Sequence, residues 1–321
     1  MELRNVIQLL TLVAAAWVGS IHAQAYPSKA IRIIVPSSAG GGIDVTTRVF
    51  TPRLSEVFGQ PVLVENRPGA QTMIGTEMVA KAAPDGYTLL TVFDNFPLTQ
   101  HMMKNVPYDA LKDFAPISLL VRGPMIVGVP PQLGVKNLSQ FVNLVKSKPG
   151  AFSYGSASVG TSSHLTVELF KQRTGTDLKG THYKGAAPAV TDLMGGHIQL
   201  MIAASGTLIR QVESGKLVAL AVTAPNRIPQ LPGVPAMAES YPGFQAHSWV
   251  GMLAPAATPT AIVRRLNAEV SKILADAEVV SLFRKRSWDV AGGTPEDFRK
   301  WLATQTELWV RVIRERNITL N

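Results

Sequence analysis

The sequence predicts an α/β fold, and two observations lead to it. Short runs of β-branched or apolar residues are followed by loops rich in glycine or serine, and then by apolar residues at helical spacing. This alternation predicts a parallel sheet with helices on both faces. The chain has 321 residues, 46% hydrophobic and 17% charged, which is a globular composition and long enough for two domains.

The first strand–loop–helix unit spans Ile31–Asp44. The β-branched run Ile31–Val35 predicts a buried strand, Pro36 ends it, and three glycines, Gly40–Gly42, then permit close approach to the backbone. Pro52 is expected to kink or restart the helix that follows. Free N–H groups at the start of such a helix favour an anion. The loop lacks the spacings of nucleotide-binding glycine motifs, which leaves a carboxylate site or a simple tight turn as the alternatives.

Two more strands in the first half of the chain lead to candidate binding loops. Pro61–Asn66 is followed by the loop Arg67–Gln71, and Tyr87–Phe93 is followed by Asn95. Ligands of parallel sheets bind beyond the carboxyl ends of the strands, so these loops are expected at the same edge as the glycine loop.

The pattern changes where a second domain is expected to begin. Phe114–Val121 and Met125–Val129 are predicted to be short strands separated by Arg122-Gly123-Pro124, and Ser248–Leu253 is predicted to be the returning strand. The predicted first domain is therefore residues 26–122 with 248–321, and the second is residues 123–247. From Pro259 onwards the chain is expected to be helical.

The second domain repeats the strand–loop–helix arrangement with hydroxyl groups added. The strand Phe152–Gly155 enters the loop Ser156–Ser163, which offers N–H and O–H donors to an anion, although ordinary helix capping would use the same residues. Ser158 and His164 also suggest a nucleophile and a base, but the Gly-x-Ser-x-Gly pattern is not matched. A serine-dependent exported hydrolase is therefore kept as an alternative function.

The N-terminus predicts export. Arg4 precedes a mostly apolar run, Val6–Gly19, and Ala23-Gln24-Ala25 fits the small-x-small cleavage rule. Residues 1–25 are interpreted as a signal peptide, which places the mature protein in the periplasm; an uncleaved membrane anchor is the alternative.

Composition excludes several other functions. The net charge of +9 comes from scattered residues, 31 Lys and Arg against 22 Asp and Glu, which argues against a nucleic-acid partner. The absence of cysteine excludes disulfides, thiolate nucleophiles and cysteine zinc sites. His164, His182, His197 and His247 are too dispersed for a metal-binding pair, and no metal or cofactor is expected.

From Tyr26 to the C-terminus, the chain resembles the substrate-binding receptors of tripartite tricarboxylate transporters, the Bug-type periplasmic proteins. The matching segments, in order, are Tyr26-Pro27 with Ile31–Asp44, Val64–Ala70, Ala82–Leu90, Tyr154–Ser156 with Ser162–Leu165, Tyr183–Gly185, Gly215–Leu217 with Ala219–Thr223, and Leu253–Pro255. Each segment is short, but their order over the mature length is specific.

This resemblance implies two α/β domains in the Venus-flytrap arrangement of type II-like periplasmic binding proteins, which close on a small carboxylate. It implies a monomeric receptor, not an enzyme, that delivers its ligand to the membrane subunits of a tripartite tricarboxylate transporter. A sensor kinase is the alternative partner. The residues expected to bind the ligand are Ser37, Ser38, Ala39, Gly40, Gly41, Asp44, Asn95, Ser156, Ser158, Thr161, Ser162, Ser163, Tyr183 and Ala204.

The residues around the predicted cleft also suggest which carboxylates bind. A buried ammonium group requires an acceptor or a counter-charge, and Ala203-Ala204-Ser205 offers no carboxylate. Of the nearby acids, Asp44 is expected to be engaged at its own helix N-terminus, which leaves Asp94. We therefore expect a preference for carboxylates without an amino group over aspartate or glutamate.

Overall fold

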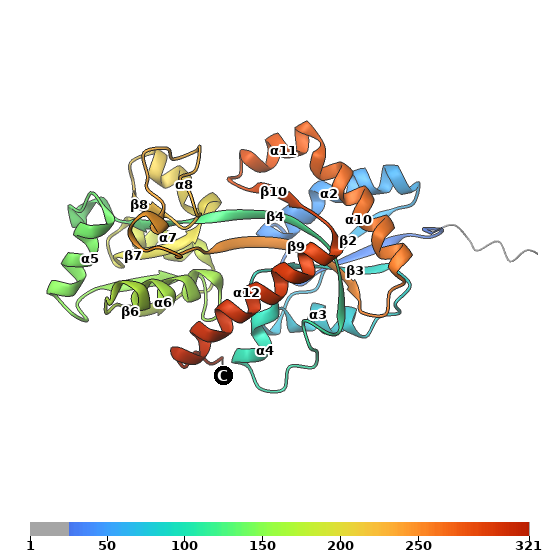
Figure 1. Ribbon diagram of the computed structural model, residues 1–321, viewed down its shortest axis with the longest axis horizontal. Helices are drawn as coiled ribbons and strands as arrows, with labels where there is room; N and C mark the ends of the chain where they lie inside the picture. Colours follow the sequence, from blue (N-terminus) through green and yellow to red (C-terminus); the bar gives the residue numbers. More distant parts are fainter. Residues whose placement is uncertain (1–25, 321) are drawn as a thin grey trace, which may run out of the picture.

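A mixed sheet runs through both lobes of the computed structural model (Figure 1), which describes residues 26–320. Its strand order is β2-β1-β3-β9-β4-β7-β5-β6, and β8 and β10 each pair with β4. The predicted signal peptide lies outside the described residues. No helix within residues 26–320 combines the length and the apolar character needed to cross a membrane.

The first lobe is built around three parallel strands. β1 (Ile31–Val35) lies between β2 (Val62–Asn66) and β3 (Thr88–Phe93). α2 (Gly42–Phe58) and α10 (Thr260–Ala275) share one apolar cluster with β1, whereas residues of α3 (Met73–Ala80) belong to the cluster on the other side. The carboxyl ends of all three strands point towards the second lobe.

Two long antiparallel strands join the lobes, β4 (Phe114–Val129) and β9 (His247–Pro255). The prediction of two short strands here was wrong, because β4 is continuous through Arg122-Gly123-Pro124. Pro124 lies where β4 exchanges β9 and β10 for β7 and β8 as partners, a position where a missing N–H is tolerated.

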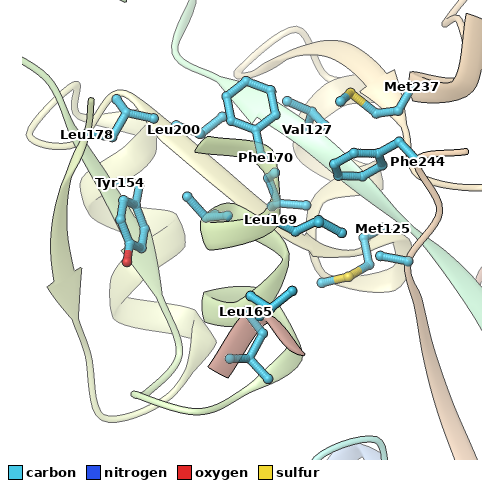
Figure 2. Close-up of a cluster of buried hydrophobic side chains, with 14 of the residues drawn as sticks. Met125, Val127, Tyr154, Leu165, Leu169, Phe170, Leu178, Leu200, Met237 and Phe244 are labelled. Atoms are coloured by element: carbon cyan, nitrogen blue, oxygen red, sulfur yellow. The ribbon is translucent and has the colours of Figure 1, made fainter. Parts of the chain in front are cut away.

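In the second lobe, β5 (Ser153–Ser156) pairs in parallel with β6 (Lys179–His182) and β7 (Leu200–Ala204). β8 (Val218–Val222) is antiparallel to β4. Helices cover this part of the sheet: α5 (Leu138–Ser147), α6 (Ser162–Thr174), α7 (Ala186–Met194) and α8 (Ser205–Glu213). Figure 2 shows the core between α6 and the sheet, where Phe170 lies beside Leu200 and Leu165 belongs to the same apolar cluster.

The C-terminal segment departs from the all-helical prediction. α11 (Ala277–Arg284) is followed by a short strand, β10 (Asp289–Gly292), which pairs antiparallel with β4. α12 (Pro295–Glu315) then runs from the first lobe to the second (Figure 1). Its first half packs in the core of the first lobe, and its last turns join the apolar cluster of α6. Two single-turn helices complete the fold, α4 (Thr99–Met102) and α9 (Met237–Ser240).

The expected break at Pro52 was also wrong, because α2 continues through it. Pro52 lies on the exposed side of the helix. Water can therefore satisfy the backbone carbonyl that loses its N–H partner.

Candidate functional site

A cavity of about 330 Å³ lies between the two lobes. It is bounded by the carboxyl end of β3, the start of α2, the start of α6 and the end of β7. Its walls hold no Lys, Arg or His side chain among the described residues. The lining residues are Ser37, Ile43, Thr72, Phe93, Asp94, Asn95, Met125, Ala157, Thr161, Ser162, Ser163, Ala186, Met201, Ala203, Ala204, Thr207 and Ser248.

The glycine loop of the first lobe is held in shape by Asp44. The Gly40 N–H donates to the Asp44 carboxylate over 2.8 Å, and Arg48 Nε and Asn66 Nδ2 donate to it over 3.0 and 2.9 Å. The hydrogen bond from Arg48 is the main reason why the pKa of Asp44 falls to about 2. Asp44 is thus engaged at its own helix start, as predicted, and does not line the cavity.

The start of α2 itself remains available to a ligand. Its N-cap residue, Gly41, makes no side-chain cap, so the first N–H groups of the helix lack the partner that a cap supplies. Ser37 and Ile43 bring this terminus to the cavity wall. A Cβ at Gly41 would lie 3.2 Å from the Ser38 carbonyl oxygen, so a larger side chain would press on the loop.

The start of α6 faces the same cavity from the second lobe. Thr161 caps this helix: its hydroxyl accepts from the His164 N–H over 3.5 Å and donates to the Ser158 carbonyl over 2.8 Å. Ser162 and Ser163 follow and line the cavity. The Ser163 hydroxyl is buried and has no hydrogen-bond partner within residues 26–320. Because buried polar groups are normally paired, this unpaired hydroxyl makes Ser163 a candidate for contact with a ligand.

Thr72 also lines the cavity, although the predicted site omitted it, and its buried hydroxyl has no hydrogen-bond partner among residues 26–320. Ala70, Gln71 and Thr72 all have positive φ values, of 46°, 53° and 76°. Left-handed backbone is costly for non-glycine residues, above all for a β-branched one, and such strain is concentrated at functional sites. Gln71-Thr72, directly after Gly69-Ala70, gave no sequence signal for this conformation.

Among the described residues, Asp94 is the one acid on the cavity wall, and the predicted site omitted it as well. It follows β3 directly, and Ser248 Oγ on β9 donates to its Oδ2 over 2.6 Å. Burial raises the pKa of Asp94 to about 6, although hydrogen bonds from Ser248, Ser162 and backbone N–H groups favour the charged form. The sequence signal was its place beside Asn95, at the carboxyl end of a strand.

The structure divides the predicted site residues into two groups. Six of them line the cavity: Ser37, Asn95, Thr161, Ser162, Ser163 and Ala204. The other eight do not: Ser38, Ala39, Gly40, Gly41, Asp44, Ser156, Ser158 and Tyr183.

Several residues of the second group have other partners. Ser156 is fully buried, with its hydroxyl 2.8 Å from His182 Nδ1 and 3.1 Å from the Ser158 carbonyl. The Tyr183 hydroxyl donates to Asp192 over 2.7 Å. Both side chains therefore support the loops behind the cavity.

These contacts also argue against the hydrolase alternative. His164 Nδ1 accepts from the Gly160 N–H over 3.1 Å, and burial lowers the pKa of His164 to about 4. The pairing of Ser156 with His182 lies behind the cavity wall, where a substrate would not reach the hydroxyl. The polar groups of the cavity are suited to binding a ligand and not to attacking it.

The model of the tripartite tricarboxylate transporter family receptors matches residues 46–318 of the chain. The chain belongs to this family. Protein BugT of Bordetella pertussis is 35% identical over 324 residues, with 98% of this chain and 99% of that protein covered. The protein is accordingly a periplasmic solute-binding receptor and not an enzyme.

Solved structures agree with the family assignment. A Rhodopseudomonas palustris protein solved with adipate has a TM-score of 0.82 and 31% identity, and the match covers 92% of this chain and 99% of that one. MatC from the same organism, solved with bound malate, has a TM-score of 0.78 and 29% identity, covering 90% and 100%. The two-domain periplasmic-binding-protein architecture predicted from the resemblance is thereby confirmed.

Proposed function

We propose that this receptor binds a small carboxylate without an amino group in the cavity between its lobes, and delivers it to the membrane subunits of a tripartite tricarboxylate transporter. The observation that carries the proposal is the convergence of two helix N-termini, those of α2 and α6, on a cavity whose described lining holds no cation. Helix N-termini with free N–H groups bind anions without help from a basic side chain.

The size and chemistry of the cavity support a small acid. A volume of about 330 Å³ is at the lower end for ligand pockets. Hydrogen bonds to a charged group contribute roughly 1.5–3 kcal/mol each, and micromolar affinity corresponds to about −8.2 kcal/mol. Four or five such bonds therefore provide the affinity, less the cost of ordering. The adipate and malate bound by the related proteins are carboxylates of this kind.

A thermal-shift panel tests the ligand class. Succinate, glutarate, adipate, malate and benzoate are compared with aspartate and glutamate, with a neutral sugar as the control. A ligand at a hundred times its Kd stabilises the native state by about 2.7 kcal/mol. The plain carboxylates are expected to raise the melting temperature. Stabilisation by the amino acids alone would contradict the proposed ligand class.

Export and domain division are part of the proposal. We infer that cleavage near Tyr26 releases the mature receptor into the periplasm, which N-terminal sequencing of periplasmic material would test. We also infer that β4 and β9 form the hinge between residues 26–122 with 248–321 and residues 123–247. α12 packs in the first lobe through its first half and against α6 through its last turns, so the contact between α12 and α6 is expected to change during closure.

Closure gives a further prediction. Because donors from both lobes line one cavity, a carboxylate that spans them favours the closed state. Small-angle scattering is expected to show a smaller radius of gyration at saturating succinate or adipate, with sodium chloride at matched ionic strength as the control. Trp288 packs beside Phe93, a cavity residue, and should report ligand binding by fluorescence. An unchanged radius at saturation would contradict closure.

A further inference from the structure

The cavity contains a charge that the proposed function does not use. Asp94 is 6% exposed, lies on the cavity wall, and has no salt-bridge partner among the described residues. A ligand carboxylate at the start of α6 would bind beside Ser162, whose hydroxyl also favours the charged Asp94. Two carboxylates would then share one small, weakly solvated space, and like charges so placed cannot both remain ionised without a large cost.

We propose that Asp94 is a specificity-determining residue that pairs with the ligand carboxylate through a shared proton, so that the cavity takes up one proton with each small carboxylate it binds. The inference rests on the proposed function, because it requires a carboxylate ligand. A protonated Asp94 donates a hydrogen bond to the ligand oxygen, while Ser248 keeps the other oxygen in place.

The alternative role for Asp94 would be to receive an ammonium group, and its surroundings argue against it. Ser248 already donates to Asp94 over 2.6 Å, and Ser162 and the backbone N–H groups of Asn95 and Trp249 are directed at the same carboxylate. A carboxylate offers about four acceptor positions, so few remain for the three donors of an ammonium group.

The neighbouring ionisable groups keep one charge state across the pH range of interest. On β9, burial next to Arg122 of β4 lowers the pKa of His247 to about 4, so His247 is neutral. On α6, burial lowers the pKa of His164 to about 4. At the start of α2, Asp44 has a pKa of about 2 and stays ionised.

Of the remaining neighbours, Arg210 on α8 and Arg286 before β10 are basic side chains that do not line the cavity, and burial lowers the pKa of His182 on β6. Asp94 is the one ionisable side chain among the described residues that line the cavity, and its pKa of about 6 places its change of charge between pH 5 and pH 8. Because its pKa in the free protein is about 6, the proton is absent above that pH and must be taken up on binding.

The coupling of proton uptake to ligand binding fixes the direction and the size of the pH dependence of the affinity. Above the pKa of the free Asp94 and below that of the complex, affinity for a carboxylate falls about tenfold for each pH unit. Between pH 6 and pH 8 the Kd for succinate or glutarate is therefore expected to rise by up to about a hundredfold. Affinity for an ammonium ligand would instead fall below the pKa of Asp94 and would not depend on its titration above that pH.

The test is a calorimetric titration of the full mature protein with succinate and with glutarate at pH 5, 6, 7 and 8. Each titration is repeated in two buffers of different ionisation enthalpy, which counts the protons taken up. Asp94→Asn keeps the shape and supplies a permanent donor, so its Kd is expected to be independent of pH and below the wild-type Kd at pH 8. Asp177→Asn, which changes an exposed acid, is the control.

Ser248→Ala provides a second variant that retains Asp94. It removes the 2.6 Å hydrogen bond that favours the charged form, so the midpoint of the pH profile is expected to move upwards. Two results would overturn the inference and leave the proposed function intact. One is a wild-type affinity that does not depend on pH, and the other is weaker binding by Asp94→Asn than by the wild type at pH 8. Failure of every acid to bind at any pH would overturn both.

Discussion

Replacing Ser163 by alanine is expected to weaken carboxylate binding by roughly 10- to 150-fold, the value of one hydrogen bond to a charged group. Ser163 lines the cavity at the start of α6, and its hydroxyl is buried without a partner within the described residues. The substitution Ser163→Ala therefore removes no hydrogen bond from the unliganded protein. Its free energy of unfolding is expected to stay unchanged or to rise by about 1 kcal/mol, because an unsatisfied buried group is removed.

Ser156→Ala is the matched comparison for that variant. It removes the same atom at the end of β5, where Ser156 Oγ is paired with His182 Nδ1 and with the Ser158 carbonyl. We expect it to lower the free energy of unfolding by about 1–3 kcal/mol. Chemical denaturation and calorimetry of both variants give the two readouts. Unchanged affinity in Ser163→Ala, or a loss of stability as large as in Ser156→Ala, would contradict the assignment of Ser163.

Asp44→Asn is expected to lower both stability and affinity. A pKa held at about 2 instead of 3.8 means that the charged Asp44 stabilises the native state by about 2 kcal/mol at neutral pH. Because this pKa is lower in the native state, the contribution is complete above about pH 4 and is lost as the pH falls towards 2. The same carboxylate holds Gly40, so the glycine loop loosens and affinity is expected to fall at least about tenfold.

Urea denaturation between pH 2.5 and pH 7 measures this effect. The wild type is expected to lose more stability over that range than Asp44→Asn, with the difference concentrated below pH 4. Asp85→Asn is the control, because Asp85 pairs with Lys29 on the surface, where such pairs contribute little. Identical acid profiles for wild type and Asp44→Asn would show that Asp44 does not have this role.

The local strand–loop–helix units could be predicted from the sequence. β1, its proline stop and α2 lie where the β-branched run and the glycines indicated. These features depend on residues close together in the chain. The continuity of β4 does not depend on nearby residues alone. Pro124 is tolerated because β4 changes its pairing partners there, and those partner strands come from remote parts of the sequence.

The candidate site shows the same limit. Ser156 and Ser163 are both serines of the same predicted binding loop. In the structure, Ser156 is hydrogen-bonded to His182, whereas Ser163 lines the cavity and its hydroxyl has no partner among the described residues. Only the tertiary structure distinguishes the two. The Thr161 hydroxyl caps α6, so its removal would test capping as much as binding. Thr72 reaches the cavity through a left-handed turn that no local sequence pattern predicts.

Donors from α2 and α6 are proposed to bind one small carboxylate between the lobes. Calorimetric titration of the mature protein with succinate, glutarate and benzoate at pH 6, run in parallel on Ser163→Ala, tests it most directly. We expect at least one of these three acids to bind with a stoichiometry of one per protein. Its affinity is expected to be at least about tenfold weaker for Ser163→Ala. Equal affinity in both proteins, or no binding of any acid by the wild type, would contradict it.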